Sequence, residues 1–558
     1  MSGSPSAAAT LLRLGREGQS AAAGLLYRAL RHWPGGGRGP DDLLATIEDP
    51  WPGSSEAGLA MLEGEMSFCG QTFAFDRPNW APEKAGTPWL DCLHGFAWLR
   101  DLRAVGSDTA RTHARTLVES WIDLAPQHTP RIWQAEVLGA RVAAWLGHVG
   151  WLAASSEDPL RRKMLDSLAL QARHLLRVAP LAAEGATRLV ALKGMFHALH
   201  ALPQGKVAER RQTRARSLLL AAVKEQVLAD GGHIERSPSV QLAVLADLVE
   251  IRALLAAART ELPDFLLNAI DRMAPIVRFF RHGDGGFALF NDSNEAEAAA
   301  IDVVLAVSDA KGKPPNAAPH VGFQRLVAGR TLVLADAGTP ASIDRHAHAG
   351  TLSFEMSVGK ERLVVNCGAA LSDPSEWRRA QRATAAHSAL SIADTNSSEI
   401  LDGSGGRWLG RRPRRVEAQR DEDNGTVWLT MSHDGYAPVF GVVHQRRLFL
   451  DADGEDLRGE DMLQVKTGRE EPPRFAIRFH LHPRVQVALN QQGGALLRLP
   501  SGQGWRFRSA GALLELADSI YLGRRGEMRR SQQLVLRGEA QGSETIVKWA
   551  LQREGGKR

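Results

Sequence analysis

The sequence predicts an α+β multidomain protein, in which an N-terminal α/α toroid is followed by a C-terminal antiparallel β-sandwich. Apolar residues recur at three- and four-residue spacing through roughly the first 310 residues, as in amphipathic helices. The composition then changes at a Lys- and Pro-rich linker, residues 311–319, and short apolar runs separated by turn residues follow. Helices first and strands second indicate separate layers within one α+β chain.

The helical spacing is continuous within separate windows that short Gly, Pro and Asp loops divide. These windows are residues 111–124, 133–152, 159–178, 188–201, 210–229, 239–257 and 262–280. No strict repeat length joins them, which favours a toroid of antiparallel helices over a repeat array. We expect residues 51–310 to form this toroid and residues 1–50 to be a partly helical extension.

The second half contains short runs rich in β-branched and aromatic residues, with turn residues between them. The runs are residues 331–335, 352–356, 362–365, 426–430, 474–479, 495–499 and 532–536. Regular short strands of this kind are typical of an antiparallel sandwich. We expect residues 320–558 to form it.

Composition narrows the class of protein. The 558 residues are 44% hydrophobic and 23% charged, which is typical of a globular protein with a large core. The formal charge of +5 is small for this length. It argues against a nucleic-acid binder, but it allows an anionic substrate in a locally basic groove.

Cysteine content and the N-terminus bear on the compartment. The three cysteines lack CxxC spacing, which argues against a disulfide framework and a Cys-rich zinc site. No apolar core of a signal peptide follows a basic start, and no run of about 18 apolar residues predicts a transmembrane helix. The sequence by itself therefore predicts a cytoplasmic protein.

The most informative block for function contains three histidines in residues 346–387. His346 and His348 are two apart in an extended segment, so their side chains point to the same face. A second strand ends at Asn366, and His387 follows after a turn. Three imidazoles brought together in this way suit a metal site, or a histidine base beside one.

Together with the helical first half, this block resembles the bacterial heparinase II/III-like polysaccharide lyases. Residues 89–98 resemble that family's early Trp, Leu-His segment, and residues 230–241 resemble its Asp-Gly, Glu and Ser-Pro segment. Members combine an α/α toroid with a β-sandwich and cleave uronic-acid polysaccharides, glycosaminoglycans among them, by β-elimination. The resemblance implies an acidic polysaccharide as the substrate and no nucleic acid as a partner; it leaves the oligomeric state unknown.

The resemblance also assigns residues. It implies that His346 is the catalytic histidine, and that His348, Asn366 and His387 occupy a family zinc site of His, Asp and His. One structural zinc is the cofactor so implied, and a hydrogen-bonded His–Asn–His cluster is the alternative, because Asn366 is neutral. Val240 and Gln241 stand where the family has its Tyr-His pair, and Arg188 lies near the place of a family Asn-His pair.

Other residues could replace the missing tyrosine. We expect His233 and Glu235 to share the acid–base work with His346. Cations, hydroxyls and carboxylates that could line a groove for the sugar are Arg188, Arg236, Asp292, Arg382 and Tyr436. Glu235 and Arg236 have an equally simple structural interpretation as charges preceding a helix that Ser237 caps.

The leading functional hypothesis is a polysaccharide lyase that cleaves a uronic-acid-containing glycan by β-elimination. The alternative is a catalytically silent relative that binds an acidic glycan of the cell envelope, which the loss of the tyrosine favours. A glycoside hydrolase of the toroid type ranks third and would use Glu235 and Asp292 as its two carboxylates. Family resemblance places the protein in the cell envelope or periplasm, whereas the absence of a visible signal peptide leaves the cytoplasm as the alternative.

Overall fold

The computed structural model describes residues 38–45, 48–124, 130–155, 157–343, 345–370, 376–401, 409–465, 472–491, 493–524 and 527–555. Most of the expected N-terminal extension, residues 1–50, lies outside these ranges. The chain divides into two compact units. One unit is helical and consists of the described residues up to Gln226 together with Ala243–Ile270. The other unit comprises Val227–Leu242 and Asp271–Arg558.

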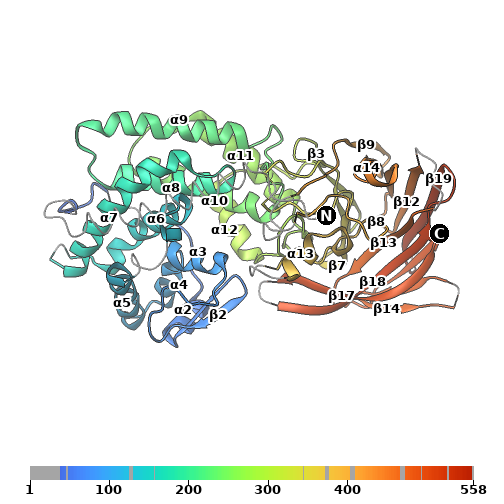
Figure 1. Cartoon of the computed structure of the whole chain (residues 1–558), viewed down its shortest axis with the longest axis horizontal. Coiled ribbons are helices and arrows are strands. Elements are labelled where there is room, and N and C mark those ends of the chain that lie inside the picture. The colour runs from blue at the N-terminus through green and yellow to red at the C-terminus, as the bar shows by residue number, and fades with distance from the viewer. Residues whose placement is uncertain are drawn as a thin grey trace. The chain divides into compact units, whose positions relative to one another are not determined.

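Helices make up most of the first unit (Figure 1). They are α2 (Ser55–Leu62), α3 (Thr87–Gly95), α4 (Leu99–Val105), α5 (Asp108–Leu124), α6 (Ala135–Leu152), α7 (Pro159–Val178), α8 (Ala186–Ala201) and α9 (Ala208–Gln226), with a small hairpin of β1 (Glu65–Phe68) and β2 (Gln71–Ala74). Helices α10 (Pro238–Ala257) and α11 (Asp264–Phe279) each contribute residues to both units. Every helical window expected from the sequence overlaps one of these helices. No helix in the described ranges is long and apolar enough to cross a membrane.

Local sequence explains individual helices. The Asp158 side chain caps α7 by accepting from the backbone N–H of Leu160, and Pro159 follows at the first helical turn, where its missing N–H costs nothing. Helix α6 packs closely on α8 because both carry glycine at the contact. A Cβ on Gly139 would lie 2.7 Å from the Cα of Ala191, so a larger residue would force the helices apart.

The segment at residues 89–98, which matched the early family motif, is part of the core of the helical unit. His94 is buried, and its Nδ1 accepts from the indole N–H of Trp121 at 3.0 Å. Burial, and then the charge of Arg141, lower the pKa of His94 to about 3, so its imidazole is neutral. The Arg141 guanidinium lies over the Trp121 ring at 4.4 Å. The residues of this segment therefore have a packing role in the core of the helical unit.

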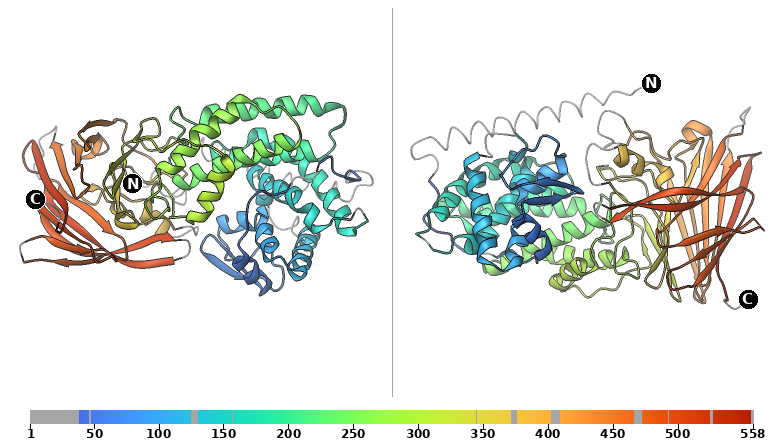
Figure 2. Two further views of the ribbon diagram at one scale, coloured as in Figure 1. Left: turned by 180° about the vertical axis from the view of Figure 1, so that it is seen from behind. Right: turned by 90° about the horizontal axis from the view of Figure 1, so that it is seen from below.

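The second unit contains two antiparallel sheets (Figures 1 and 2). The first has the order β17-β18-β13-β7-β6-β5-β4-β3, with β8 also paired to β13, and the second has the order β14-β15-β16-β19-β12-β11-β10-β9. Their bounds are β3 (Ala317–Ala318), β4 (Phe323–Ala328), β5 (Thr331–Asp336), β6 (Phe354–Val358), β7 (Glu361–Val365), β8 (Leu390–Ile392), β9 (Val416–Asp423), β10 (Thr426–His433), β11 (Val442–Leu450), β12 (Asp456–Val465), β13 (Arg474–Leu481), β14 (Gln486–Leu489), β15 (Ala495–Arg498), β16 (Gly504–Ala510), β17 (Leu513–Arg524), β18 (Glu527–Glu539) and β19 (Glu544–Arg553).

One hydrophobic core joins the two sheets. Strands β10 and β11 alternate between buried and more exposed residues, as strands with one face on a core do. Phe354 of the first sheet stacks on Trp549 of the second, with ring centroids 5.5 Å apart. The change from helices to strands falls after α12 (Ala298–Ser308), near the predicted linker. The predicted order of a helical domain and then an antiparallel sheet region is therefore confirmed.

Strands β5 and β6 are buried on both faces. On β6, Phe354 and Met356 face the core, so Glu355 and Ser357 face the other side. There His282 bonds both of them, with Nε2 2.9 Å from Glu355 Oε2 and Nδ1 2.8 Å from Ser357 Oγ. The segment after α11 thus covers the outer face of this sheet.

Candidate active site

Segments from three parts of the second unit meet beyond the Asp336 end of β5. One precedes α10 and carries Glu235, one follows α11 and carries Asn291 and Asp292, and the loop between β5 and β6 carries His346. Asn291 joins them, since its Nδ2 donates to the Arg236 carbonyl and its Oδ1 accepts from the His348 backbone N–H. Asn291 and Asp292 have φ of 49° and 60°, a left-handed backbone that Asn and Asp tolerate better than most residues.

Asp292 is the hub of the site. Its Oδ2 lies 3.1 Å from His346 Nδ1 and 2.7 Å from an Arg378 guanidinium nitrogen, and its Oδ1 lies 3.0 Å from His348 Nε2. Burial alone would raise the pKa of the Asp292 carboxyl. Arg378 and the two histidines outweigh burial and hold the pKa well below its usual range, so Asp292 is a carboxylate at neutral pH.

His346 is the accessible member of this group. Its side chain is 28% exposed, whereas those of Asp292 and Glu235 are 8% and 3% exposed. With Nδ1 on Asp292, the Nε2 atom lies 3.6 Å from Glu235 Oε2. The arrangement is an imidazole oriented by a buried carboxylate, with a second carboxylate near its other nitrogen, and such a group can move a proton.

His233 and Arg236 flank Glu235 but are enclosed. His233 is fully buried, and its Nδ1 accepts from the Glu235 backbone N–H at 3.3 Å. Burial lowers the pKa of His233 to about 4, which keeps it neutral. The Arg236 guanidinium donates to the carbonyls of Val321 and Gly322 and pairs with Asp336 at 2.5 Å. These contacts give His233 and Arg236 structural roles in this unit.

Of the three residues that the resemblance assigns to a zinc site, His348 and His387 contact each other, but the set does not fit a zinc ion. His348 Nδ1 lies 3.1 Å from His387 Nε2, while His387 Nδ1 bonds the Ala383 carbonyl at 2.8 Å. Asn366 supplies a neutral amide, and its Oδ1 already accepts from the Ser388 N–H at 3.1 Å. Within the described ranges no group of three or more His, Cys, Asp or Glu is arranged to hold a metal. The two histidines bond each other, whereas the Asn366 Nδ2 is buried without a hydrogen-bond partner among the described residues, so Asn366 does not complete a hydrogen-bonded cluster with them.

The remaining predicted residues lie elsewhere or are buried. Arg188 belongs to the helical unit, where it pairs with Glu225 at 2.8 Å. Arg382 is fully buried, and its Nε donates to the Ala347 carbonyl at 2.9 Å, so it supports the loop between the two site histidines. Tyr436 is fully buried in the sandwich core, and its hydroxyl donates to the Leu390 carbonyl at 2.6 Å. The expectation that Tyr436 faces a groove is wrong, because no part of its side chain is accessible.

Gln241, which stands at the histidine position of the family's Tyr-His pair, has a structural role in this chain. Gln241 is buried, its Oε1 accepts from the His233 N–H at 2.7 Å, and its Nε2 donates to the carbonyls of Gly231 and Met273. Gln241 thereby fixes the turn that carries Glu235. Sequence reasoning missed two other residues of the site, Asn291 as a bridge and Arg378 as the partner of Asp292. No spacing signal points to Arg378, because it lies 86 positions from Asp292.

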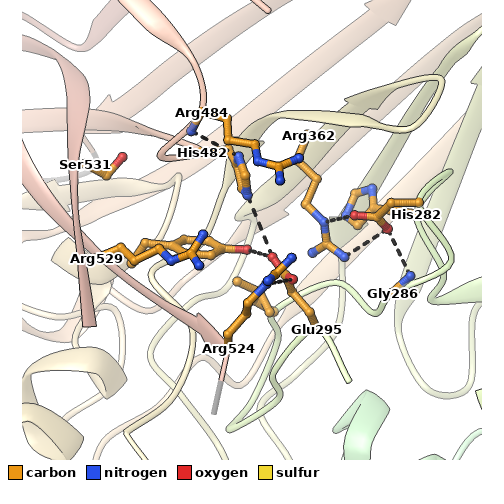
Figure 3. Close-up of polar contacts among 12 residues, drawn as sticks. His282, Gly286, Glu295, Arg362, His482, Arg484, Arg524, Arg529 and Ser531 are labelled. Atoms are coloured by element: carbon orange, nitrogen blue, oxygen red, sulfur yellow. Dashed lines mark hydrogen bonds and ion pairs between the residues drawn. The ribbon is translucent and has the colours of Figure 1, made fainter. Parts of the chain in front are cut away.

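A second polar cluster surrounds Glu295, three residues after Asp292 in the sequence, and contains Tyr521. Glu295 accepts from the Tyr521 hydroxyl, and its carboxylate lies 3.2 Å from Arg524 Nε and 3.7 Å from His482 Nε2 (Figure 3). Burial raises the pKa of Tyr521 well above its usual value, so its phenol stays protonated. Tyr521 is 1% exposed, and a buried phenol engaged in this way is a structural donor.

Comparison with known proteins agrees with the sequence motifs and the fold. Residues 118–309 match the heparinase II/III N-terminus and residues 310–550 match the heparinase II/III-like C-terminal domain. The chain is 33% identical over 534 residues to the FtsZ-localized protein C of Caulobacter vibrioides, covering 93% of this chain and 91% of that protein.

Two solved structures share the fold. The crystal structure of heparinase III has a TM-score of 0.70 at 14% identity, with 96% of this chain and 90% of that chain covered. The heparan sulfate lyase HepC from Pedobacter heparinus has a TM-score of 0.59 at 16% identity, with 97% and 89% covered. At these identities the likeness concerns the fold alone. The domain matches and the full-length relative place this chain in the heparinase II/III-like family.

Proposed function

We propose that this protein is a polysaccharide lyase that cleaves a uronic-acid-containing glycan by β-elimination, with His346 as the group that moves the proton. The observation that carries the proposal is the partly exposed imidazole of His346, oriented by the buried carboxylate of Asp292. It occurs on the fold of heparin- and heparan-type lyases. Family membership supports the lyase class, and the site supports this choice of residue.

The chemistry assigns a role to each atom of the site. A base takes the proton from C5 of the uronate, the electron pair of that bond forms the C4=C5 double bond, and the C4–O bond breaks. The leaving oxygen takes up a proton. Because Asp292 accepts from Nδ1 of His346, Nε2 presents the lone pair that removes the C5 proton. Glu235, 3.6 Å from Nε2, is the group that can pass the proton on to the leaving oxygen.

A second candidate function has its own support. The tyrosine position of the family is Val240, and the 33%-identical relative is named for its localization with FtsZ. Both observations favour a catalytically silent relative that binds an acidic glycan of the cell envelope. In this alternative His346 contacts the sugar without transferring a proton.

Ultraviolet absorbance during incubation with a panel of polyuronates and glycosaminoglycans separates the two functions, because the C4=C5 double bond is conjugated to the carboxylate. We expect a rising signal on at least one glycan, and a loss of about 10²- to 10⁴-fold in rate for His346→Ala. The exposed His320 provides the matched control, and His320→Ala should retain the wild-type rate. A flat trace for the wild type, with saturable binding of a glycan, would favour the silent relative.

A further inference from the structure

A basic cavity lies at the opposite end of β5 and β6 from His346. It has a volume of about 270 Å³ and is formed by the β4–β5 turn, the β6–β7 turn and the segment after α11. Thr331, at the start of β5, lines the cavity, whereas Asp336, at the end of β5, adjoins the site of His346. Five steps along a strand span roughly 17 Å, so the cavity is separate from that site.

The charged side chains that line this cavity are all cationic. Arg281, Arg325, Arg330 and Lys360 line it, and no carboxylate does. Arg281 pairs with the exposed Asp302 at 2.7 Å. In the part of the chain that the structure describes, the side chains of the other three cations form no ion pair, and the Nε of Arg325 is buried without a hydrogen-bond partner. Burial without a counter-charge lowers the pKa of Arg325.

The backbone around the cavity is shaped for close approach. A Cβ on Gly283 would lie 1.8 Å from the Gly359 carbonyl oxygen, so the two turns touch only because Gly283 has no side chain. A Cβ on Gly359 would lie 2.6 Å from an Arg330 guanidinium nitrogen, so the Arg330 guanidinium lies directly over Gly359. Because these two positions are glycine, the turns that carry Arg330 and Lys360 can lie close to the segment that carries Arg281.

A partly buried guanidinium without a partner is costly, and an anion of matching geometry removes that cost. Arginine forks bind carboxylate, sulfate and phosphate oxygens through paired N–H donors. We propose that this cavity is a second binding site, which takes the oxyanion group of a compact ligand or of one unit of an acidic polymer. Arg325 and Arg330 contact the anion directly, and Lys360 contributes charge from the rim.

Isothermal titration of the full chain with inorganic phosphate, sulfate and glucuronate, each at constant chloride concentration, tests the proposal. We expect saturable binding of at least one of these anions to one site. Arg325→Met and Arg330→Met should each weaken that binding by about 10-fold or more, since each removes a charged hydrogen-bond donor. The exposed Arg508 lies on β16 of the other sheet, so Arg508→Met should bind like the wild type. His346→Ala should do so as well, which separates this site from the proposed lyase site.

The three probes also identify the source of the anion. A preference for glucuronate indicates a uronate of the glycan, and a preference for sulfate or phosphate indicates an ester group. Lys360→Met, in an exposed turn, provides a variant that should fold normally, as circular dichroism can check. Absence of saturable binding to all three anions would overturn the proposal, and so would binding that Arg325→Met, Arg330→Met and Lys360→Met leave unchanged.

Discussion

Replacing Asp292 with asparagine should disable and destabilise the candidate active site together. Asparagine has nearly the shape of aspartate, but its side chain is neutral and has one oxygen, instead of two, that can accept hydrogen bonds. The change removes the negative charge between His346, His348 and Arg378, which approach to 3.1, 3.0 and 2.7 Å. Arg378 is 9% exposed and would lose its ion pair with the Asp292 carboxylate.

Removal of one partner from a buried ion pair costs about 3–5 kcal/mol, and the lower end applies where the carboxylate is replaced by a polar amide of similar shape. A loss of about 3 kcal/mol corresponds to a fall of roughly 5–10 °C in Tm for a unit of this size. Because His346 would lose the acceptor that fixes its tautomer, the rate of β-elimination should fall by about 10²- to 10⁴-fold.

Differential scanning fluorimetry and the ultraviolet assay measure the two effects separately. The double variant Asp292→Asn/Arg378→Met removes both charges, so its Tm should lie above that of Asp292→Asn alone. An Asp292→Asn protein that melts with the wild type would refute the assignment of Asp292 as the hub. A double variant less stable than Asp292→Asn would show that Arg378 is stabilised by other partners.

Three further outcomes follow from the structure. Arg236→Met removes the ion-pair partner of the buried Asp336 and should lower the free energy of unfolding by about 3 kcal/mol. Urea denaturation measures this change, and an unchanged urea midpoint would contradict the structural role of Arg236. The pKa values of His94 and His233, about 3 and 4, lie below the value of about 6.5 for an unfolded histidine, so the unfolded state binds more protons below that pH. Stability should therefore be full above pH 6.5 and fall towards pH 4, and a constant Tm across this range would contradict the buried neutral state. Metal analysis of the purified protein should give sub-stoichiometric zinc that Asn366→Asp increases. Stoichiometric zinc in the wild type would refute the inference that His348, Asn366 and His387 do not fit a zinc ion.

The elements that sequence patterns predicted well depend on local spacing. Helices α5 to α8 begin and end close to their predicted windows, because an amphipathic face repeats within each helix. Helices α2 to α4 were not predicted, because they are short and their windows contain few complete turns. The all-buried strand β5 was recognised from its continuous apolar run, which also fits its burial on both faces.

The site depended on contacts that sequence spacing cannot reveal. Asp292 was predicted as a substrate-binding residue, but its partners lie 54, 56 and 86 positions away in sequence, and they make it the orienting carboxylate. Tyr436 attracted attention because the chain has three tyrosines, yet its hydroxyl is satisfied by a carbonyl 46 positions away. Long-range pairing of this kind decides whether a polar side chain faces a ligand or the core.

The mass of the new chain ends, after an acidic glycan is incubated with the protein in water enriched in oxygen-18, distinguishes β-elimination from hydrolysis. β-Elimination adds no water, so we expect an unsaturated end without oxygen-18, and His346→Ala should produce none. Oxygen-18 in the new reducing end would mean hydrolysis, with Glu235 and Asp292 as the two carboxylates, and would contradict the assignment of His346 as the base.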